Sequence, residues 1–355
     1  MVRALSTRFA PEATRVTVSE CSNALAWGNY VKSNSSATIY HQYGWKAVIE
    51  KSFGHRGYYL ACERDGAVTG VLPLVEMKSW LFGKFLISVP YFNYGGVLAD
   101  DELSREALIQ RASALAQELG SRHIELRQGT QIPLNLAEVS AKVAMVVPLP
   151  SDKAQYSKML SSRLRNKIRH AEKHGLECRW GGRELLDDFY SVFAVNMRDL
   201  GTPVYPKIWF ENVLESMGDQ AQILSIWDGK TPVAATVMFR FRDTVELPWI
   251  ASTPEARKHY STALLYWTAI TWAIEQGFRK VDLGRCTKDG GTYQFKQQWA
   301  CEEIPLHWYY WLAPGVPVPR IRPDNPKYRL AINVWKKLPL SVANTFGPKI
   351  VRFIP

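Results

Sequence analysis

The sequence has no run of apolar residues long enough to cross a bilayer, and its few cysteines form no recognisable set. None of its windows reaches the roughly 18 apolar residues that a spanning helix needs. The five cysteines are widely spread and include no C-x-x-C pair, which argues against a zinc site and a disulfide framework and favours a reducing compartment. The segment Met1 to Ser19 lacks the apolar core of a signal peptide. We therefore predict a cytoplasmic protein that binds no metal.

Low-complexity blocks and long runs of like charge are also missing, which excludes extensive disorder. A chain of 355 residues with 46% apolar residues is long enough for two domains of about 150 residues each. Its 44 Lys and Arg against 33 Asp and Glu give a net charge of +11. This excess predicts a polyanionic partner, which could be nucleic acid, anionic lipid or a phosphorylated substrate.

One order of secondary-structure elements occurs twice along the chain. The first half predicts helices within 22–53, a strand hairpin around Asp65-Gly66, a further strand, a helix ending at Gly120 and a last strand. The second half repeats strand, Asp228-Gly229 turn, two strands, a helix ending at Gly277 and a strand. We interpret this as two copies of one mixed α/β (α+β) unit, although two generic units could resemble each other by chance. The predicted divisions are 1–150, a basic connecting helix at 151–175, 176–312, and a proline-rich connection with an amphipathic helix at 313–355.

The stretch from Gly284 to Trp299 has the features of a reaction site. It follows the alternating residues 280–283, which predict a strand, and we expect a glycine-containing loop leaving a sheet edge. Tyr293, Phe295 and Trp299 surround Lys296, so that its ammonium would be partly desolvated and able to stabilise an oxyanion. The alternative is a surface lysine whose stem lies over apolar rings. Arg285 is available for a phosphate or carboxylate of the substrate.

Three further segments contribute candidates. The polar and aromatic patch 37–46 would form one wall of a ligand cleft through His41, Trp45 and Lys46, or else a buried loop between two helices. Residues 152–174 carry a basic face with Arg165, Lys167 and Arg169, which would bind phosphates or RNA or would only be solvated. For a general base, the ionisable candidates on the strands of the second copy are Glu246 and Asp282.

Several short motifs resemble those of Fem-type aminoacyltransferases and of the related FemAB-like and BioF2-like acetyltransferase-domain proteins. They are Arg165-Asn166-Lys167-Ile168-Arg169-His170, Asp282-Leu283-Gly284-Arg285, and Tyr293-Gln294-Phe295-Lys296-Gln297-Gln298-Trp299. The passages His41-Gln42-Tyr43-Gly44-Trp45 and Asn93-Tyr94-Gly95-Gly96 look like the branch associated with exopolysaccharide and exosortase systems. The resemblance adds Asn93, Tyr94 and Gly95 to the predicted substrate-binding residues.

The resemblance implies two tandem GNAT-like domains and the transfer of an acyl or aminoacyl group to an amine on a peptidoglycan or exopolysaccharide precursor. It also implies that Lys296 supports the transferred carbonyl. No tightly bound cofactor is expected, and the donor would be acyl-CoA or aminoacyl-tRNA. The glycines of a GNAT acyl-CoA loop are absent from Arg257-Lys258-His259-Tyr260-Ser261-Thr262, and too few residues separate Gly175 from the strand at 223 for the long helical arm of Fem ligases.

Two other classes of function are compatible with the sequence. One is a non-catalytic scaffold of a polymer export system that binds an anionic glycan or a lipid-linked intermediate, and the other is an RNA-binding module. The enzyme requires a protected Lys296, the scaffold does not, and an RNA module would lose affinity steeply with salt. The C-terminal amphipathic helix at 328–338 is expected to pack on the body of the protein, and the alternative is a peripheral contact with the anionic inner membrane.

Overall fold

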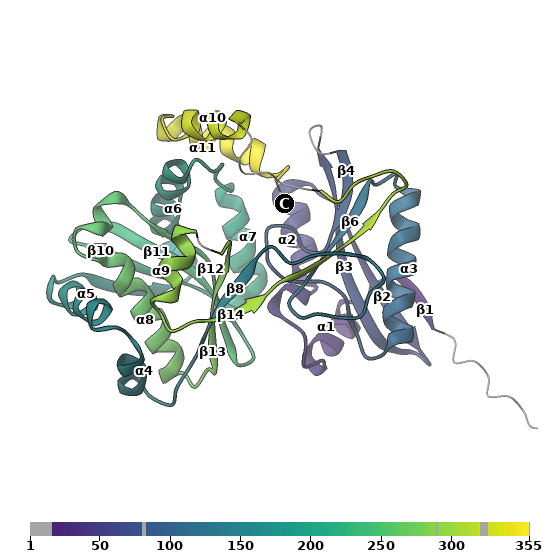
Figure 1. Cartoon of the computed structure of the whole chain (residues 1–355), viewed down its shortest axis with the longest axis horizontal. Helices are drawn as coiled ribbons and strands as arrows, with labels where there is room; N and C mark the ends of the chain where they lie inside the picture. Colours follow the sequence, from purple (N-terminus) through teal and green to yellow (C-terminus); the bar gives the residue numbers. More distant parts are fainter. Residues whose placement is uncertain (1–15, 80–82, 289, 320–325, 355) are drawn as a thin grey trace, which may run out of the picture.

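The computed structural model describes residues 16–354 except 80–82, 289 and 320–325, so that most of the segment Met1 to Ser19 and part of the proline-rich connection lie outside the described residues. Two halves lie side by side, and each contains a mixed sheet with helices packed against it (Figure 1). The first half comprises β1 (Thr17–Glu20), α1 (Ala24–Ser33), α2 (Gly44–Phe53), β2 (Gly57–Arg64), β3 (Ala67–Ser79), β4 (Gly83–Ile87), β5 (Leu98–Ala99), α3 (Glu102–Glu118), β6 (His123–Gln128), β7 (Ala137–Val139) and β8 (Val143–Pro148).

The second half begins with two helices that pack outside its sheet. Its elements are α4 (Lys153–Met159), α5 (Ser162–Lys173), β9 (Glu177–Gly181), α6 (Leu186–Leu200), α7 (Lys207–Met217), β10 (Ala221–Asp228), β11 (Thr231–Phe241), β12 (Thr244–Ser252), α8 (Ser261–Glu275), β13 (Lys280–Cys286), α9 (Gly291–Gln297), β14 (Glu302–Pro305), β15 (His307–Leu312), α10 (Pro326–Trp335) and α11 (Leu340–Val351).

Local sequence signals set several helix ends. The Asp101 carboxylate accepts a hydrogen bond from the Ser104 amide at the start of α3, and Asn23 caps α1 in the same way through the amides of residues 25 and 26. Gly120 and Gly277 follow α3 and α8 with φ of 65° and 78°, a left-handed conformation that glycine adopts without the steric cost of a Cβ. These two turns occupy equivalent places in the two halves, which agrees with the repeated order in the sequence.

The strand orders of the two sheets show the duplication directly. The first sheet runs β1-β2-β3-β4-β6-β15-β7, with β5 beside β3, and the second runs β9-β10-β11-β12-β13-β8-β14. Within the described residues, the pairs β4–β6 and β12–β13 are parallel and all other neighbouring strands are antiparallel. The prediction of two mixed sheets flanked by helices is confirmed.

The halves also exchange a strand, which the sequence did not predict. β8 lies within the predicted division 1–150 but pairs with β13 and β14 of the second sheet. β15 lies within the predicted division 176–312 but pairs with β6 and β7 of the first sheet. Both strands occupy the same position in their adopted sheets, next to the second strand of the parallel pair. The boundaries at 150 and 312 therefore do not separate the two sheets.

Aromatic side chains from both halves form one shared core between the sheets. Trp45 of α2 stacks on Trp209 of α7 with ring centroids 6.1 Å apart, and Phe92 and Trp249 pack in the same cluster. Two further cores lie under α3 in the first half and under α8 in the second. The shared core fixes the two sheets relative to each other, which is required of a site built from both.

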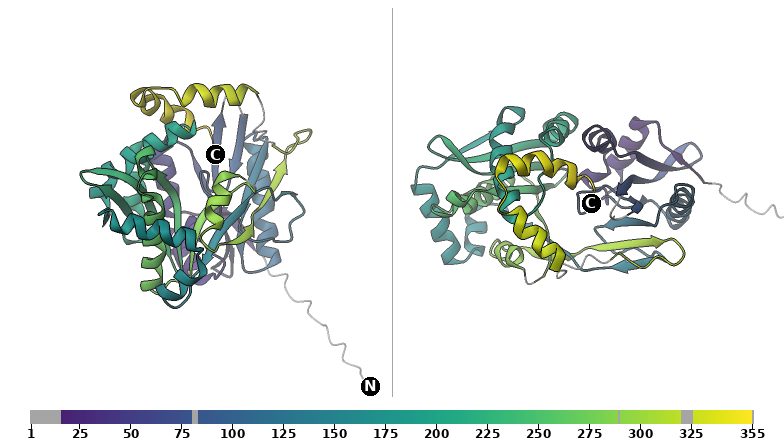
Figure 2. Two further views of the ribbon diagram at one scale, coloured as in Figure 1. Left: turned by 60° about the vertical axis from the view of Figure 1, so that its left-hand side comes forward. Right: turned by 90° about the horizontal axis from the view of Figure 1, so that it is seen from above.

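Three local predictions differ from the structure. Residues 152–174 form two helices, because α4 ends at Leu160 and the Ser161 hydroxyl caps a new helix. The expected loop after residue 290 is the short helix α9, and β13 lies inside its sheet and not at an edge. The C-terminal arm contains two helices, α10 and α11, which lie over α6 (Figure 2). No helix among the described residues is both long and apolar enough to span a membrane.

Candidate active site

The parallel strands β12 and β13 separate at the point where the candidate residues lie. Their pairing ends at Glu246 opposite Asp282. Beyond this pair β13 contains a bulge, because two residues between Asp282 and Arg285 face a single residue between Val146 and Ala144 on β8. Gly284 sits in this bulge with φ of 80°, a conformation that glycine adopts readily. The bulge interrupts the regular hydrogen bonding of β13. The backbone carbonyls of Gly284 and Arg285 are therefore free to accept hydrogen bonds from a side chain.

Glu246 and Asp282 form a buried pair of carboxyl groups on these neighbouring strands. The Tyr94 hydroxyl donates to Asp282 Oδ2 at 2.7 Å and the Gly284 amide donates to Oδ1 at 2.6 Å, while the Tyr40 hydroxyl hydrogen-bonds Glu246. Burial, and then the Asp282 charge, raise the pKa of Glu246 to about 8, and burial also raises the pKa of Asp282. Since two adjacent carboxylates repel each other in a low-dielectric site, the pair retains one proton at neutral pH.

The equivalent carboxyl group of the first half is neutralised, which distinguishes the two halves chemically. Glu125 of β6 corresponds to Asp282, because it lies opposite Ile87 in the parallel pair β4–β6 as Asp282 lies opposite Glu246. Arg127 donates to Glu125 at 2.7 Å, and the Tyr310 hydroxyl donates to the same carboxylate at 3.0 Å. No arginine pairs with Asp282 in the described residues, so its carboxylate keeps the capacity to accept a proton.

Lys296 of α9 lies against the bulge. Its Nζ donates to the backbone carbonyls of Gly284 at 3.0 Å and Arg285 at 3.2 Å, and the side chain is 6% exposed. Burial lowers the pKa of Lys296, and the neighbouring Asp282 charge acts in the opposite direction. Two of its three N–H groups are thus occupied by carbonyls. The ammonium is held in one orientation and has one donor left for another group.

The missing side chain of Gly284 leaves room between Lys296 and the first half. A Cβ at this position would lie 3.7 Å from Lys296 Nζ and 3.9 Å from Asn93 Nδ2. Two hydrogen-bond donors, one from each half of the molecule, therefore face the same small space. Paired donors of this kind stabilise negative charge that develops on an oxygen atom.

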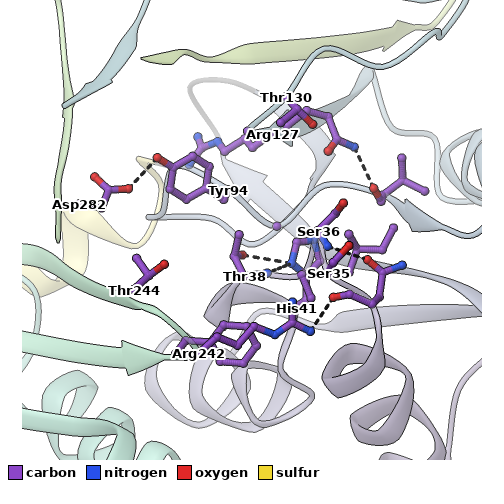
Figure 3. A pocket seen from close by; sticks show the side chains of 18 of the residues that line it. Ser35, Ser36, Thr38, His41, Tyr94, Arg127, Thr130, Arg242, Thr244 and Asp282 are labelled. Carbon is purple, nitrogen blue, oxygen red and sulfur yellow. Dashed lines mark hydrogen bonds between the residues drawn. The ribbon is translucent and has the colours of Figure 1, made fainter. Parts of the chain in front are cut away.

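A cavity of about 480 Å³ lies between the halves beside the carboxyl pair. Figure 3 shows Tyr94 and Asp282 hydrogen-bonded on one side, with Arg127 and Thr130 beyond Tyr94 and with His41 and Arg242 on the opposite wall. Glu246 and Asp282 line this cavity, whereas Lys296 does not. The space is large enough for a small substrate group next to the proton acceptors.

Comparisons with known proteins bear on the class of domain and on the fold. Residues 159–297 match the family model described as Acetyltransferase (GNAT) domain. This part of the chain is similar to an acetyltransferase (GNAT) domain. Among curated proteins, none matches the sequence significantly. The prediction of an acyltransferase is therefore confirmed at the level of this domain.

Solved structures extend the similarity to the tandem fold. The "Crystal structure of FemX" has a TM-score of 0.66 at 16% identity and covers 89% of this chain and 100% of its own. "The structure of L-PGS from Bacillus licheniformis" has a TM-score of 0.52 at 14% identity, and the match covers 83% of this chain and 96% of that structure's chain. A "Tandem GNAT protein from the clavulanic acid biosynthesis pathway" has a TM-score of 0.50 at 10% identity, and the match covers 83% of this chain and 94% of that structure's chain. The resemblance to FemAB-like proteins is confirmed in the domain family and in the fold.

Within this GNAT fold, the predicted residues divide into those near the carboxyl pair and those far from it. His41 lines the cavity, with its Nε2 3.1 Å from the Gly96 carbonyl oxygen, and burial lowers its pKa to about 4, so that it is neutral. Tyr94 and Gly95 also line the cavity. Trp299 is fully buried and supports α9 by stacking on Tyr266 at 5.2 Å.

Other predicted residues lie outside the site. Trp45 belongs to the shared core, and Lys46 pairs with Glu20 at 3.0 Å. Tyr293 hydrogen-bonds Glu303 on the outer side of α9. Arg165, Lys167 and Arg169 lie on α5, on the side of the second half away from the first (Figure 1), and Arg165 donates to the Leu160 carbonyl at 2.5 Å. The structure therefore does not bring the basic helix to the cavity.

Arg285 lies near the site, beside an arginine that the sequence analysis missed. The guanidinium carbons of Arg285 and Arg127 lie 5.3 and 4.5 Å from the Trp308 ring centroid. Among the described residues, Arg285 makes a single hydrogen bond, at 3.5 Å to the Phe92 carbonyl. Burial and the Arg127 charge lower its pKa to about 10. An anion would be stabilised here because Arg285 pairs with no acidic side chain among the described residues, whereas Arg127 is paired with Glu125.

The sequence contained a signal for Arg127 but none for the role of Tyr40. Ile124-Glu125-Leu126-Arg127 repeats Val281-Asp282-Leu283-Arg285 once the bulge residue Gly284 is removed, so the internal repeat could have identified Arg127. Tyr40 lies inside the patch 37–46, but no sequence pattern indicated that it reaches Glu246. Arg242 closes the cavity wall by donating to the carbonyls of residues 31, 32 and 34.

The carboxyl pair predicts a characteristic dependence of stability on pH. Folded Glu246 keeps its proton up to about pH 8, whereas its ordinary pKa is 4.5. Between these values the folded chain binds more protons than the unfolded chain, so the contribution of the pair to stability decreases as the pH rises. We expect Glu246→Gln to remove this decrease in denaturant unfolding measured from pH 5 to 8. The exposed Glu302→Gln serves as control, and an unchanged slope in Glu246→Gln would contradict the assignment.

Proposed function

We propose that this protein transfers an acyl or aminoacyl group to an amine by direct attack, on a peptidoglycan or exopolysaccharide precursor of the cell envelope. The observation that carries the proposal is the uncompensated carboxyl pair Glu246–Asp282 next to Lys296 at the separation of β12 and β13. A proton acceptor and an oxyanion donor thus lie beside the same bulge of β13. The FemX and L-PGS folds support the class of reaction, and the named acceptor rests on the FemAB-like resemblance.

Different residues of the site act in different steps of the proposed reaction. The amine nitrogen attacks the carbonyl carbon of the donor, a C–N bond forms, and the carbonyl oxygen becomes an oxyanion. The remaining N–H of Lys296 and the Asn93 amide stabilise this oxyanion. The ionised member of the carboxyl pair accepts the proton of the amine. Collapse of the intermediate breaks the C–S or C–O bond, and the thiolate or alkoxide that is released takes the proton from the carboxyl pair and departs as a thiol or an alcohol.

No covalent enzyme intermediate is required. Cys286 and Cys301 are near Lys296, but burial raises the pKa of both thiols, which disfavours the nucleophilic thiolate. Positioning of two substrates then supplies the remaining catalysis. Arg285 would bind a phosphate or carboxylate group of one of them, since its guanidinium is largely free of acidic partners among the described residues.

Donor binding tests this proposal. A ligand at 100 times its Kd stabilises the folded state by about 2.7 kcal/mol, so the correct donor raises the Tm. We expect such a rise with either acyl-CoA or aminoacyl-tRNA, followed by transfer of the labelled acyl group to an amine. Arg285→Gln should reduce the rise, whereas the exposed control Arg183→Gln should keep it. A chain that binds neither donor and transfers no label would contradict the proposal.

A further inference from the structure

A second cluster of chemically active side chains lies on the second half, away from the cavity. His174 follows α5, Asp228 ends β10, and His259 lies in the loop before α8. One ligand atom from each of these three residues lies within 4.8 Å of the others. The three residues are far apart in the sequence, and packing of α5 against α8 brings two of them together. This arrangement collects two imidazoles and a carboxylate at one point.

One ring nitrogen of this cluster is buried without a hydrogen-bond partner among the described residues. The rings of His174 and His259 are stacked, with centroids 3.3 Å apart and an interplanar angle of 12°. The buried nitrogen without a partner is Nδ1 of His259. A buried polar atom without a partner is destabilising. A ligand that accepts lone pairs from both rings removes this cost.

We propose that His174, His259 and Asp228 form a site for a divalent transition metal of the Zn²⁺ class. Two imidazoles and a carboxylate match the donor set of zinc, and oxygen-preferring Mg²⁺ and Ca²⁺ do not favour a site with two nitrogen ligands. Three protein ligands leave a fourth position for water or an external group. His170 is excluded from the ligand set, because its ring centroid lies 6.4 Å from that of His174 and 6.3 Å from that of His259.

The metal would join three segments that otherwise meet only at the surface. These are the end of α5, the turn between β10 and β11, and the loop that leads into α8. That loop ends at Tyr260, which has φ of 56° without being glycine and is therefore held by its surroundings. Further along α8, Tyr266 stacks on Trp299 next to Lys296. A metal at the start of α8 would thus fix the helix that supports α9.

Metal binding by the purified full-length chain tests the site. After treatment with EDTA, addition of Zn²⁺ is expected to restore one ion per chain and to raise the Tm. Co²⁺ in its place should give the visible absorption of a four-coordinate site. His174→Gln and Asp228→Asn should each weaken Zn²⁺ binding by about 100-fold or more, since even partners outside the ligand set cost 10–100-fold. His170→Gln, one helical turn away, is the matched control and should bind as the parent does.

Two results would overturn the proposal. The first is a parent chain that binds no stoichiometric Zn²⁺ or Co²⁺. The second is equal binding by the parent and His174→Gln, or equal loss in His170→Gln, either of which would show a different ligand set. Because His174 is exposed and Asp228 is partly exposed, circular dichroism of the metal-free variants should match that of the parent. Neither result affects the proposed acyl transfer, since the cluster does not line the cavity.

Discussion

The Lys296→Met variant is expected to fold normally and to transfer acyl groups roughly 10²–10³ times more slowly than the parent, the scale of losing one oxyanion donor. Methionine keeps most of the stem volume of Lys296 and deletes its charge. The carbonyls of Gly284 and Arg285 lose their donor, but the packing of Trp299 on Tyr266 holds α9 in place. The loss should appear in kcat and not in KM, because the oxyanion exists only in the transition state.

A second signature separates this role from simple packing. Burial raises the pKa of Asp282, and the charge of the Lys296 ammonium opposes this rise. Its removal should therefore move the rise of activity with pH to higher pH, since the base then holds its proton more tightly. Lys288→Met on the same segment is the matched control, because Lys288 is exposed and pairs only with Glu303 among the described residues. If Lys296→Met retained the parent rate and pH profile, Lys296 would have only a structural role, and the scaffold hypothesis would gain support.

Removal of the exchanged strand β15 is the second change for which we expect a large effect, and that effect is a loss of folding. A chain that ends at residue 306 lacks β15, and the first sheet then loses the strand between β6 and β7. The Tyr310 hydroxyl that hydrogen-bonds Glu125 is lost with it. The core contacts of Tyr309, which is 2% exposed, disappear as well. We expect this truncated chain not to fold, because the edges of β6 and β7 would expose unpaired backbone groups.

The control is a chain that ends at residue 313, which keeps β15 and lacks the same C-terminal helices. We expect it to fold with a lower Tm, as α11 covers part of the shared core. Near-ultraviolet circular dichroism and unfolding in urea distinguish the two chains. Equal unfolding midpoints would show that β15 is an appendage and not part of the first sheet.

The sequence predicted the element order well and the sheet membership poorly. Hairpins and helices are local, and Gly120 and Gly277 mark their ends without reference to the rest of the chain. β8 is a continuous apolar strand and β15 is rich in aromatic residues, so either sheet could accept them and no local pattern indicates the exchange. In the site, Lys296, Asp282 and Glu246 were predicted because motif and strand position are visible in the sequence.

The sequence does not indicate which segments far apart in the chain are in contact. Tyr40 and Tyr94 approach the carboxyl pair only because the shared aromatic core joins the two halves. The basic face of residues 162–173 was a strong signal in composition, yet it lies on α5 and away from the cavity. His174, Asp228 and His259 show no metal-ligand spacing, since each comes from a different segment. The expectation of a protein without metal rested on the cysteines and did not consider this cluster.

The exchange of β8 and β15 also has a consequence for the order in which the protein is made. The first half cannot complete its sheet when its own residues leave the ribosome, because the missing strand is encoded near residue 310. At about 5–20 residues per second, the roughly 160 residues between the two strands take on the order of 10–30 s to synthesise. During that time β6 has an open edge that can pair with a neighbouring nascent chain. Translation speed between β8 and β15 should therefore affect the yield of soluble protein.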